Sequence, residues 1–282
     1  DFTIGITGLS RFRVNAFLQR ENIVATFRRL PYDIPEINTL GLPESVINLT
    51  QKRKGLILIT GGTGSGKSTT LAAMIQKISQ ELEGHIITIE DPIEYLYNHS
   101  KSLINQREIG VDSNSFNSAL KSSLRQDPDV VSIGELRDVD SMSTALTIAE
   151  TGHLVLGTLH TNNASGTITR LIDAFEPEKQ EIIRMNLSMS LLAIISQQLI
   201  PNIENNRSLA IEVLINNPSM QAVIRENNIH QIDNYLLSGA KDGMIRMDDS
   251  ILALYNDHLI TKENALSYCH HPNELSKKLV NF

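Results

Sequence analysis

Cysteine and aromatic residues are scarce in this chain of 282 residues: it contains one cysteine, no tryptophan and 5% aromatic residues in all. The single cysteine, Cys269, excludes an intrachain disulfide framework and a cysteine-rich zinc site, and it is typical of a reducing compartment. No apolar run approaches the roughly 20 residues that span a bilayer, so we expect no transmembrane segment. A strand-like start at Asp1, without an initiator methionine, also argues against a signal peptide.

Positive charge is scarce as well, because 25 lysines and arginines face 32 aspartates and glutamates, for a net charge of −7. A nucleic-acid translocase would need a basic surface, so this balance argues against one and we expect no nucleic-acid partner. The hydrophobic content of 41% supports a sizeable core, and the length suits one large domain or two medium ones.

Glycine, in contrast, is concentrated in residues 61–68, Gly-Gly-Thr-Gly-Ser-Gly-Lys-Ser, which match the phosphate-binding pattern G-x-x-x-x-G-K-[ST]. A β-branched apolar run at 56–60 predicts a buried strand before it, and helical spacing from Ser68 to Ile78 predicts a helix after it. A glycine-rich turn between a strand and a helix points its backbone N–H groups at an anion. An ordinary glycine-rich turn that matched the pattern by chance would lack the flanking strand and helix. We therefore expect ATP and Mg²⁺ here, with Lys67 at the β- and γ-phosphates and Ser68 on the metal. The predicted cofactor-binding residues are Gly61, Thr63, Gly64, Ser65, Gly66, Lys67, Ser68 and Thr69.

From residue 55 to about 200 strand-like and helical segments alternate, which predicts an α/β fold with a doubly wound parallel sheet. Beyond residue 217 the pattern is one of short helices. The expected elements are strands at 85–90, 129–135, 153–160 and 209–215, and helices at 115–126, 139–151 and 178–199.

Residues 1–30 alternate apolar and polar positions, which predicts a three-stranded antiparallel meander with turns at 8–10 and 19–22. Three strands make a poor domain, so we expect further sequence upstream. The arginines of this segment form either a solvated face or a group that reaches a phosphate across a subunit boundary. Prolines at 31 and 35 indicate an extended connection, followed by a short helix around 44–50. The predicted divisions are 1–35, a linker at 36–54, an ATPase core at 55–216 and a helical region at 217–282.

Ligands of parallel sheets bind outside the carboxyl ends of the strands, so Glu94, Glu135 and His160 are expected to converge near the P-loop. Glu135 fits the acid on the metal side, either directly or through water, together with Ser68. Glu94 lies past a proline turn, where it can polarise the attacking water. A neutral His160 could hydrogen-bond the γ-phosphate, whereas His153, seven residues earlier, falls on the opposite face of a straight strand, so the two are not expected to share a metal.

Seven stretches taken together resemble the type IV pilus retraction (twitching motility) ATPases, the PilT-like branch of the secretion ATPase superfamily. The resemblance covers nearly the whole chain and implies a RecA-like P-loop ATPase core, a partial N-terminal PAS-like α+β domain and a helical C-terminal region. The matching stretches are 11–17, 61–74, 88–95, 104–108, 133–138, 149–155 and 157–161.

The same resemblance implies roles for individual residues. Glu94 corresponds to the catalytic glutamate and Glu135 to the Walker B acid, while His153 and His160 correspond to nucleotide-linked histidines. Arg13 and Arg28 correspond to arginines that the family brings toward nucleotide in the ring. The family further implies a homohexamer that is cytoplasmic, peripheral at the inner face of the cell membrane, and that acts on a pilus platform protein.

Three alternatives stay open. A pilus assembly or type II secretion ATPase would share the chemistry, and residues 219–226 keep only the second half of the retraction signature. Assembly enzymes typically carry a four-cysteine zinc insertion, however, and the single cysteine here favours retraction. A scaffold that binds ATP and hydrolyses it negligibly, and a nucleic-acid translocase, are the other two.

Overall fold

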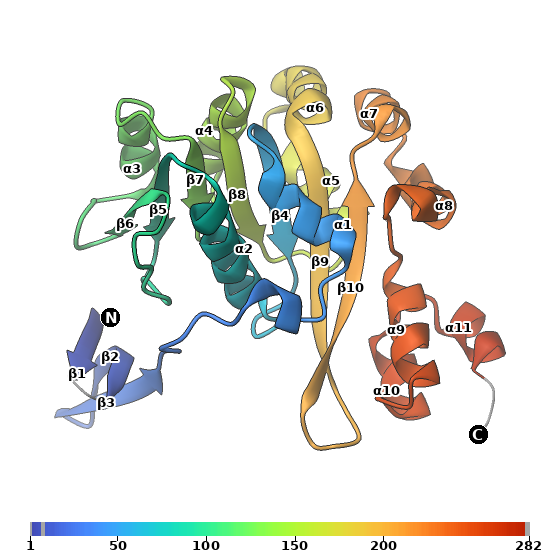
Figure 1. Cartoon of the computed structure of the whole chain (residues 1–282), viewed down its shortest axis with the longest axis horizontal. Helices are drawn as coiled ribbons and strands as arrows, with labels where there is room; N and C mark the ends of the chain where they lie inside the picture. The colour runs from blue at the N-terminus through green and yellow to red at the C-terminus, as the bar shows by residue number, and fades with distance from the viewer. Residues whose placement is uncertain (1, 7–8, 280–282) are drawn as a thin grey trace.

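Figure 1 shows a computed structural model of the chain, which describes residues 2–6 and 9–279. A seven-stranded sheet with helices on both faces forms the core, a small three-stranded sheet lies to one side, and short helices end the chain. The α/β class expected from the sequence is confirmed.

The central sheet has the strand order β10-β9-β4-β8-β7-β5-β6, and every neighbouring pair is parallel except β9 with β10. Its strands are β4 (Gly55–Thr60), β5 (His85–Glu90), β6 (Leu103–Glu108), β7 (Val130–Ile133), β8 (Leu154–Leu159), β9 (Leu191–Pro201) and β10 (Arg207–Ile215). The helices that follow or cover them are α1 (Glu44–Ile47), α2 (Lys67–Glu81), α3 (Phe116–Ser123), α4 (Val139–Glu150), α5 (Ala164–Asp173) and α6 (Pro177–Ser190).

The central strands are apolar on both faces because helices cover both faces. Every residue of β4 and β8 is buried. On one side of the sheet Leu58 packs in a cluster with Met142 of α4 and Ile168 of α5. On the other side Ile57 packs with Met74 of α2. This arrangement fixes the strand direction and brings the carboxyl ends of β4, β5, β7 and β8 to one edge.

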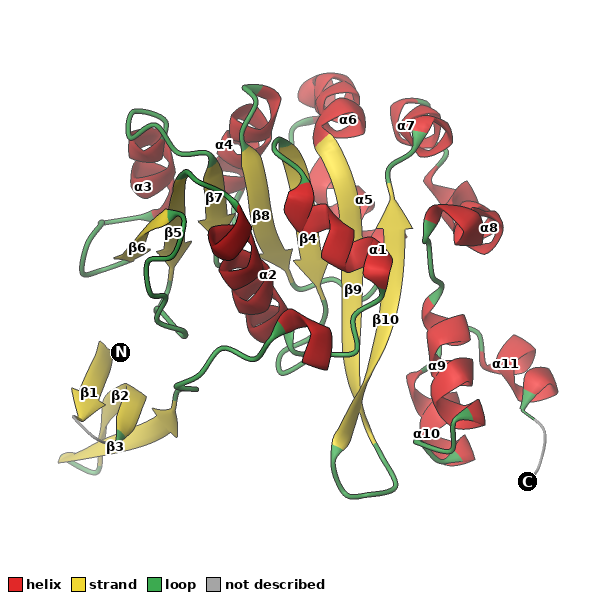
Figure 2. Ribbon diagram, viewed as in Figure 1, coloured by secondary structure: helices red, strands yellow, loops and turns green. Residues whose placement is uncertain are grey.

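The prediction of one helix over 178–199 is wrong. Helix α6 ends at Ser190, and the chain continues as β9, which Figure 2 shows entering the sheet between β4 and β10. The apolar run at 191–195 suits a buried helix or a buried strand equally well in sequence, and pairing with two neighbours decides for the strand. The predictions also omitted β6 and α5.

The N-terminal meander forms as expected, with β1 (Phe2–Ile6), β2 (Ser10–Gln19) and β3 (Asn22–Arg29). Gly8, in the first expected turn, lies outside the described residues. Thr3 Oγ1 donates to Glu108 Oε1 of β6 at 3.2 Å, which joins this sheet to the core. The segment that follows contains the expected short helix in two pieces, α1 and the 3₁₀ helix η2 (Asn48–Gln51), next to another 3₁₀ turn, η1 (Ile37–Thr39). Its apolar side chains pack against α2.

The chain beyond residue 217 is helical, as expected. It comprises α7 (Pro218–Arg225), α8 (Ile232–Ser238), α9 (Met247–Asn256), α10 (Lys262–Tyr268) and α11 (Pro272–Lys278), with 3₁₀ turns η3 (Ile229–Gln231) and η4 (Gly239–Asp242). Helices α9 to α11 form a small core of their own against β9 and β10. Within the described ranges, no helix has the length and apolarity needed to cross a bilayer.

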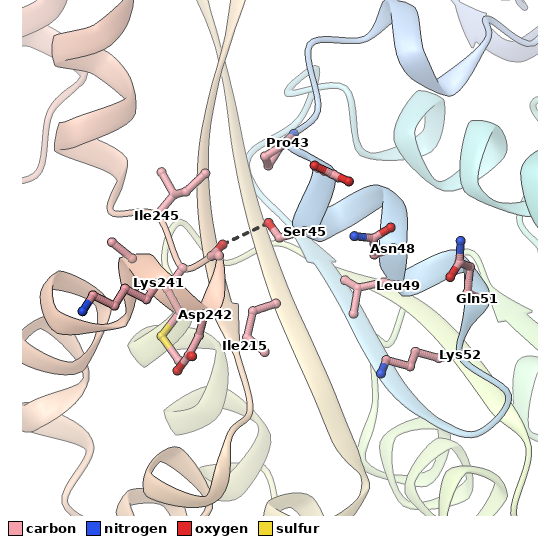
Figure 3. A pocket seen from close by; sticks show the side chains of 14 residues that line it. Pro43, Ser45, Asn48, Leu49, Gln51, Lys52, Ile215, Lys241, Asp242 and Ile245 are labelled. Carbon is pink, nitrogen blue, oxygen red and sulfur yellow. Dashed lines mark hydrogen bonds between the residues drawn. The ribbon is translucent and has the colours of Figure 1, made fainter.

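A cavity of about 790 Å³ separates α1 and η2 from residues 240–245. Ser45 Oγ bridges it by donating to the carbonyl oxygen of Gly243 at 3.0 Å (Figure 3). Lys52, just before β4, and Ile215, the last residue of β10, both line it, so it lies toward the amino ends of the parallel strands. The cavity is therefore separate from the glycine-rich loop.

Candidate active site

The glycine-rich loop connects β4 to α2, as the sequence predicts. Gly61, Gly64 and Gly66 have φ of 143°, 79° and 94°, a region that favours glycine. A Cβ at Gly61 would collide with the carbonyl oxygen of Gln197 and with the side chain of Ser65. Gly62 has open space where a Cβ would stand, so its identity is not constrained in the same way.

The side chain of Lys67, the first residue of α2, folds back against the glycine-rich loop. Its Nζ donates to the carbonyl oxygens of Gly61 at 2.8 Å and Gly62 at 2.9 Å. Burial lowers the pKa of Lys67, and the nearby carboxylates of Glu135 and Glu94 oppose this effect. The predicted cation and two predicted acids thus share one electrostatic environment.

Glu135 follows β7 and is held by two cationic or potentially cationic side chains. Its Oε2 accepts from Arg137 Nε at 2.7 Å, and its Oε1 lies 3.3 Å from His160 Nε2. Arg137 also donates to Asp91 Oδ2 at 3.0 Å. Arg137 was not among the predicted site residues, although it follows Glu135 by two positions, because its bridging contact to Asp91 depends on the neighbouring strand.

Glu94 is positioned by Glu90, at the end of β5. Glu90 is half-buried, and its carboxylate accepts hydrogen bonds from the side chains of Thr88 and Gln106 and from the backbone N–H of Glu94, the last at 3.4 Å. Burial raises the pKa of Glu90, and the hydrogen bonds from Thr88 and Gln106 oppose this. Glu90 therefore supports the loop, while Glu94 is partly exposed at the edge where Lys67 lies.

Two further contacts fix the first turn of α2 to its surroundings. The hydroxyls of Thr69 and Tyr95 are 2.9 Å apart, which joins α2 to the loop that carries Glu94. Gln197 of β9 donates to Thr70 Oγ1 at 2.8 Å. Sequence reasoning missed Gln197 because it placed this residue on a helix.

The structure does not bring every predicted residue to this edge. His153 lies before β8, at the far end, where its carbonyl oxygen accepts from Gly55 N. Six residues of β8 at about 3.3 Å each put it about 20 Å from the P-loop edge. Arg13 and Arg28 are direct cross-strand neighbours on β2 and β3, in the small sheet beside the core.

The residues present fit a magnesium ion held together with phosphates. Mg²⁺ keeps several waters and takes one or two protein oxygens plus phosphate oxygens. Ser68, exposed at the start of α2, and Glu135 supply such oxygens. The described residues contain no cluster of three or more His, Cys, Asp or Glu side chains that could hold a metal by itself.

Comparison with known proteins agrees with this geometry. The family model of the type II/IV secretion system protein matches residues 11–239. A twitching motility protein of Neisseria gonorrhoeae is 46% identical over 94% of this chain and 71% of the relative. The type IV pilus retraction ATPase PilT of Pseudomonas aeruginosa is 44% identical over 94% of this chain and 77% of the relative.

A solved structure of the pilus retraction motor PilT with bound ADP superposes with a TM-score of 0.93 at 49% identity, covering 98% of this chain and 79% of that one. The likeness to this structure covers nearly the whole chain, both in fold and in sequence. The chain therefore belongs to the type II/IV secretion system protein family, among its ATP-hydrolysing enzymes of the pilus retraction type.

Proposed function

We propose that this protein is the motor of type IV pilus retraction, a Mg²⁺-dependent ATPase that works as a homohexamer. The observation that carries the proposal is the gathering of Lys67, Glu94, Glu135 and His160 at one sheet edge, in a chain 44–46% identical to proteins of twitching motility and pilus retraction. It would act at the cytoplasmic face of the cell membrane, on a pilus platform protein, without nucleic acid.

In the proposed reaction the amides of the glycine-rich loop and Lys67 bind the phosphates of ATP. Glu94 polarises the water that attacks the γ-phosphorus, while His160 hydrogen-bonds the γ-phosphate. Ser68 and Glu135 would hold Mg²⁺, which neutralises the charge that develops on the phosphate oxygens. His153, at the other end of β8, would influence nucleotide through that strand and not by contact.

Arg13 and Arg28 are proposed to act across a subunit boundary, where guanidinium groups stabilise transition-state charge. Residues 1–35 and 55–216 would be the two lobes whose relative angle changes with hydrolysis. The movement would turn or shift the platform protein so that the fibre is dismantled. An apposed neighbour in the ring is needed for this step, since both arginines lie on the small lateral sheet.

Two measurements test the proposal. Steady-state phosphate release by the purified ring separates a motor from an ATP-binding scaffold, and we expect turnover that DNA does not stimulate. A deletion strain should gain surface fibres and lose twitching, because assembly continues without retraction. Loss of fibres in that strain would instead identify an assembly or secretion ATPase.

A further inference from the structure

Glu212 is a buried carboxylate that the proposed reaction does not use. It lies on β10 with 2% of its surface exposed. In the sheet it is opposite Ser196, which in turn is opposite Thr60, the residue before the glycine-rich loop. Thr60 is also level with Leu159, the residue before His160. Glu212 thus lies in the same row of cross-strand neighbours as Thr60 and Leu159. Directly after these two residues, the glycine-rich loop and the segment that begins with His160 leave the sheet.

The first residues of two helices, α5 and α9, lie beside the Glu212 carboxylate. Its Oε1 accepts from Ala164 N, the first residue of α5, at 2.7 Å. The backbone N–H of Met247, the first residue of α9, also lies close enough to this carboxylate to lower its pKa. The N-terminal end of a helix carries free N–H groups and positive potential, so one carboxylate stabilises both helix starts.

The first of these helices leads to the nucleotide site. Four residues, 160–163, connect α5 to β8, and His160 at their start contacts Glu135. This short strap is therefore held at one end by Glu135 and at the other by Glu212.

The second helix leads to the C-terminal helices. His270 Nδ1 lies 3.9 Å from Glu212 Oε2, and Asp248 of α9 accepts from the backbone N–H groups of His270 and His271 at 2.6 Å and 2.9 Å. The start of α9 and the segment before α11 are thereby joined to each other by Asp248, beside Glu212 of β10.

We infer that Glu212 is a positioning residue that ties the His160 strap to helices α9 to α11, so that a shift of His160 with nucleotide is transmitted to the C-terminal helices. This inference rests on the proposed function for its driving event. It assigns to Glu212 a role in coupling, distinct from contact with ATP.

The chain offers its own probe for the test. Cys269 is the single cysteine of the sequence, and it directly precedes His270. The rate at which a thiol reagent modifies it, with and without Mg-ATP, reports on the segment held by Asp248. We expect the wild-type rate to change with nucleotide by about fivefold or more, within the range of ordinary coupling free energies.

Glu212→Gln keeps the side-chain volume but leaves one acceptor oxygen for two N–H donors. We expect the nucleotide dependence of the Cys269 rate to disappear, with kcat lowered roughly tenfold and KM little changed, the pattern of a lost transition-state interaction. Glu274→Gln is the matched control, because Glu274 is exposed on α11 and contacts Arg246 and Lys278 without touching α5. It should behave like wild type.

The inference is overturned if the Cys269 modification rate in Glu212→Gln depends on nucleotide as it does in the wild type, or if Glu274→Gln loses this dependence equally. It is also overturned if nucleotide does not change the rate in the wild type. Should Glu212→Gln fail to fold, Asp248→Asn decides, because it loosens the same path at its C-terminal end. Failure of the proposed function gives a different result: absent ATP hydrolysis in the wild-type protein, whatever Cys269 reports.

Discussion

The two edges of the central sheet carry polar side chains of similar kinds but use them differently. At the amino edge the side chains satisfy nearby backbone groups: Asp129 accepts from the N–H of His85 at 2.8 Å, and the imidazole of His153 lies 3.1 Å from the carbonyl of Ile148. At the carboxyl edge Glu135 is shared between Arg137 and His160. Charged side chains that pair with one another mark the edge where a charged substrate can be bound.

The largest expected effect comes from removing the cation at the carboxyl edge. Lys67→Ala should abolish ATP turnover, because the loop then loses its one charged side chain, which we propose binds the phosphates. Steady-state phosphate release measures this, with circular dichroism to confirm that the fold is kept. Undiminished turnover would remove the carboxyl edge as the active site.

The next largest effect on turnover is expected from Glu94→Gln. We expect kcat to fall by about 10² with nucleotide affinity largely retained, the scale of a lost general base. Fluorescent-nucleotide titration and single-turnover hydrolysis separate the two quantities. Glu81→Gln is a suitable control, since Glu81 pairs with Lys77 at the far end of α2. Equal loss in both variants would contradict the assignment of the base.

Substituting His153 and His160 compares the two edges of the sheet directly, because these residues lie at opposite ends of β8. His160→Ala should lower kcat roughly tenfold or more, because it removes a polar group from the substrate edge. His153→Ala should change kcat much less and act mainly on stability, by about 1 kcal/mol for a lost hydrogen bond. Parallel measurement of kcat and thermal unfolding checks both. A larger kinetic effect at His153 would reverse the comparison.

The last expected effect, on stability and not on turnover, is a pH dependence at Glu212. Burial raises the pKa of Glu212 to about 7 from 4.5, although the N–H groups of Ala164 and Met247 oppose this; Asp233 of α8 and Asp248 of α9 raise it further. The folded state then binds the proton more tightly than the unfolded chain, so the stabilisation is complete below about pH 4.5 and lost as pH rises through about 7.

Denaturant unfolding of the wild type between pH 5 and 8, minus that of Glu212→Gln, should reveal a decline on the order of 1–3 kcal/mol. Subtracting the variant removes the contributions of other groups that titrate in this range, His270 among them. A flat difference across this range would show that Glu212 keeps its charge on folding.

Much of the site could be predicted because its signals are local. The glycine-rich loop needs strand, turn and helix within about 20 consecutive residues, and Glu94, Glu135 and His160 each follow an apolar run that predicts its own strand. Parallel pairing then places the ends of these strands together. The structure adds the supporting residues Tyr95 and Gln197, whose partners Thr69 and Thr70 are far away in sequence.

The sequence by itself determined the phosphate-binding loop, the α/β class and the edge at which the acids gather, since local pattern and chain direction suffice for these. Tertiary structure alone decided that residues 191–201 form β9, that Arg137 joins Asp91 to Glu135, and that Glu212 lies beside the starts of α5 and α9. Each of these depends on which segments become neighbours in space. That choice reflects the burial of whole elements against one another, a quantity that no single stretch of sequence contains.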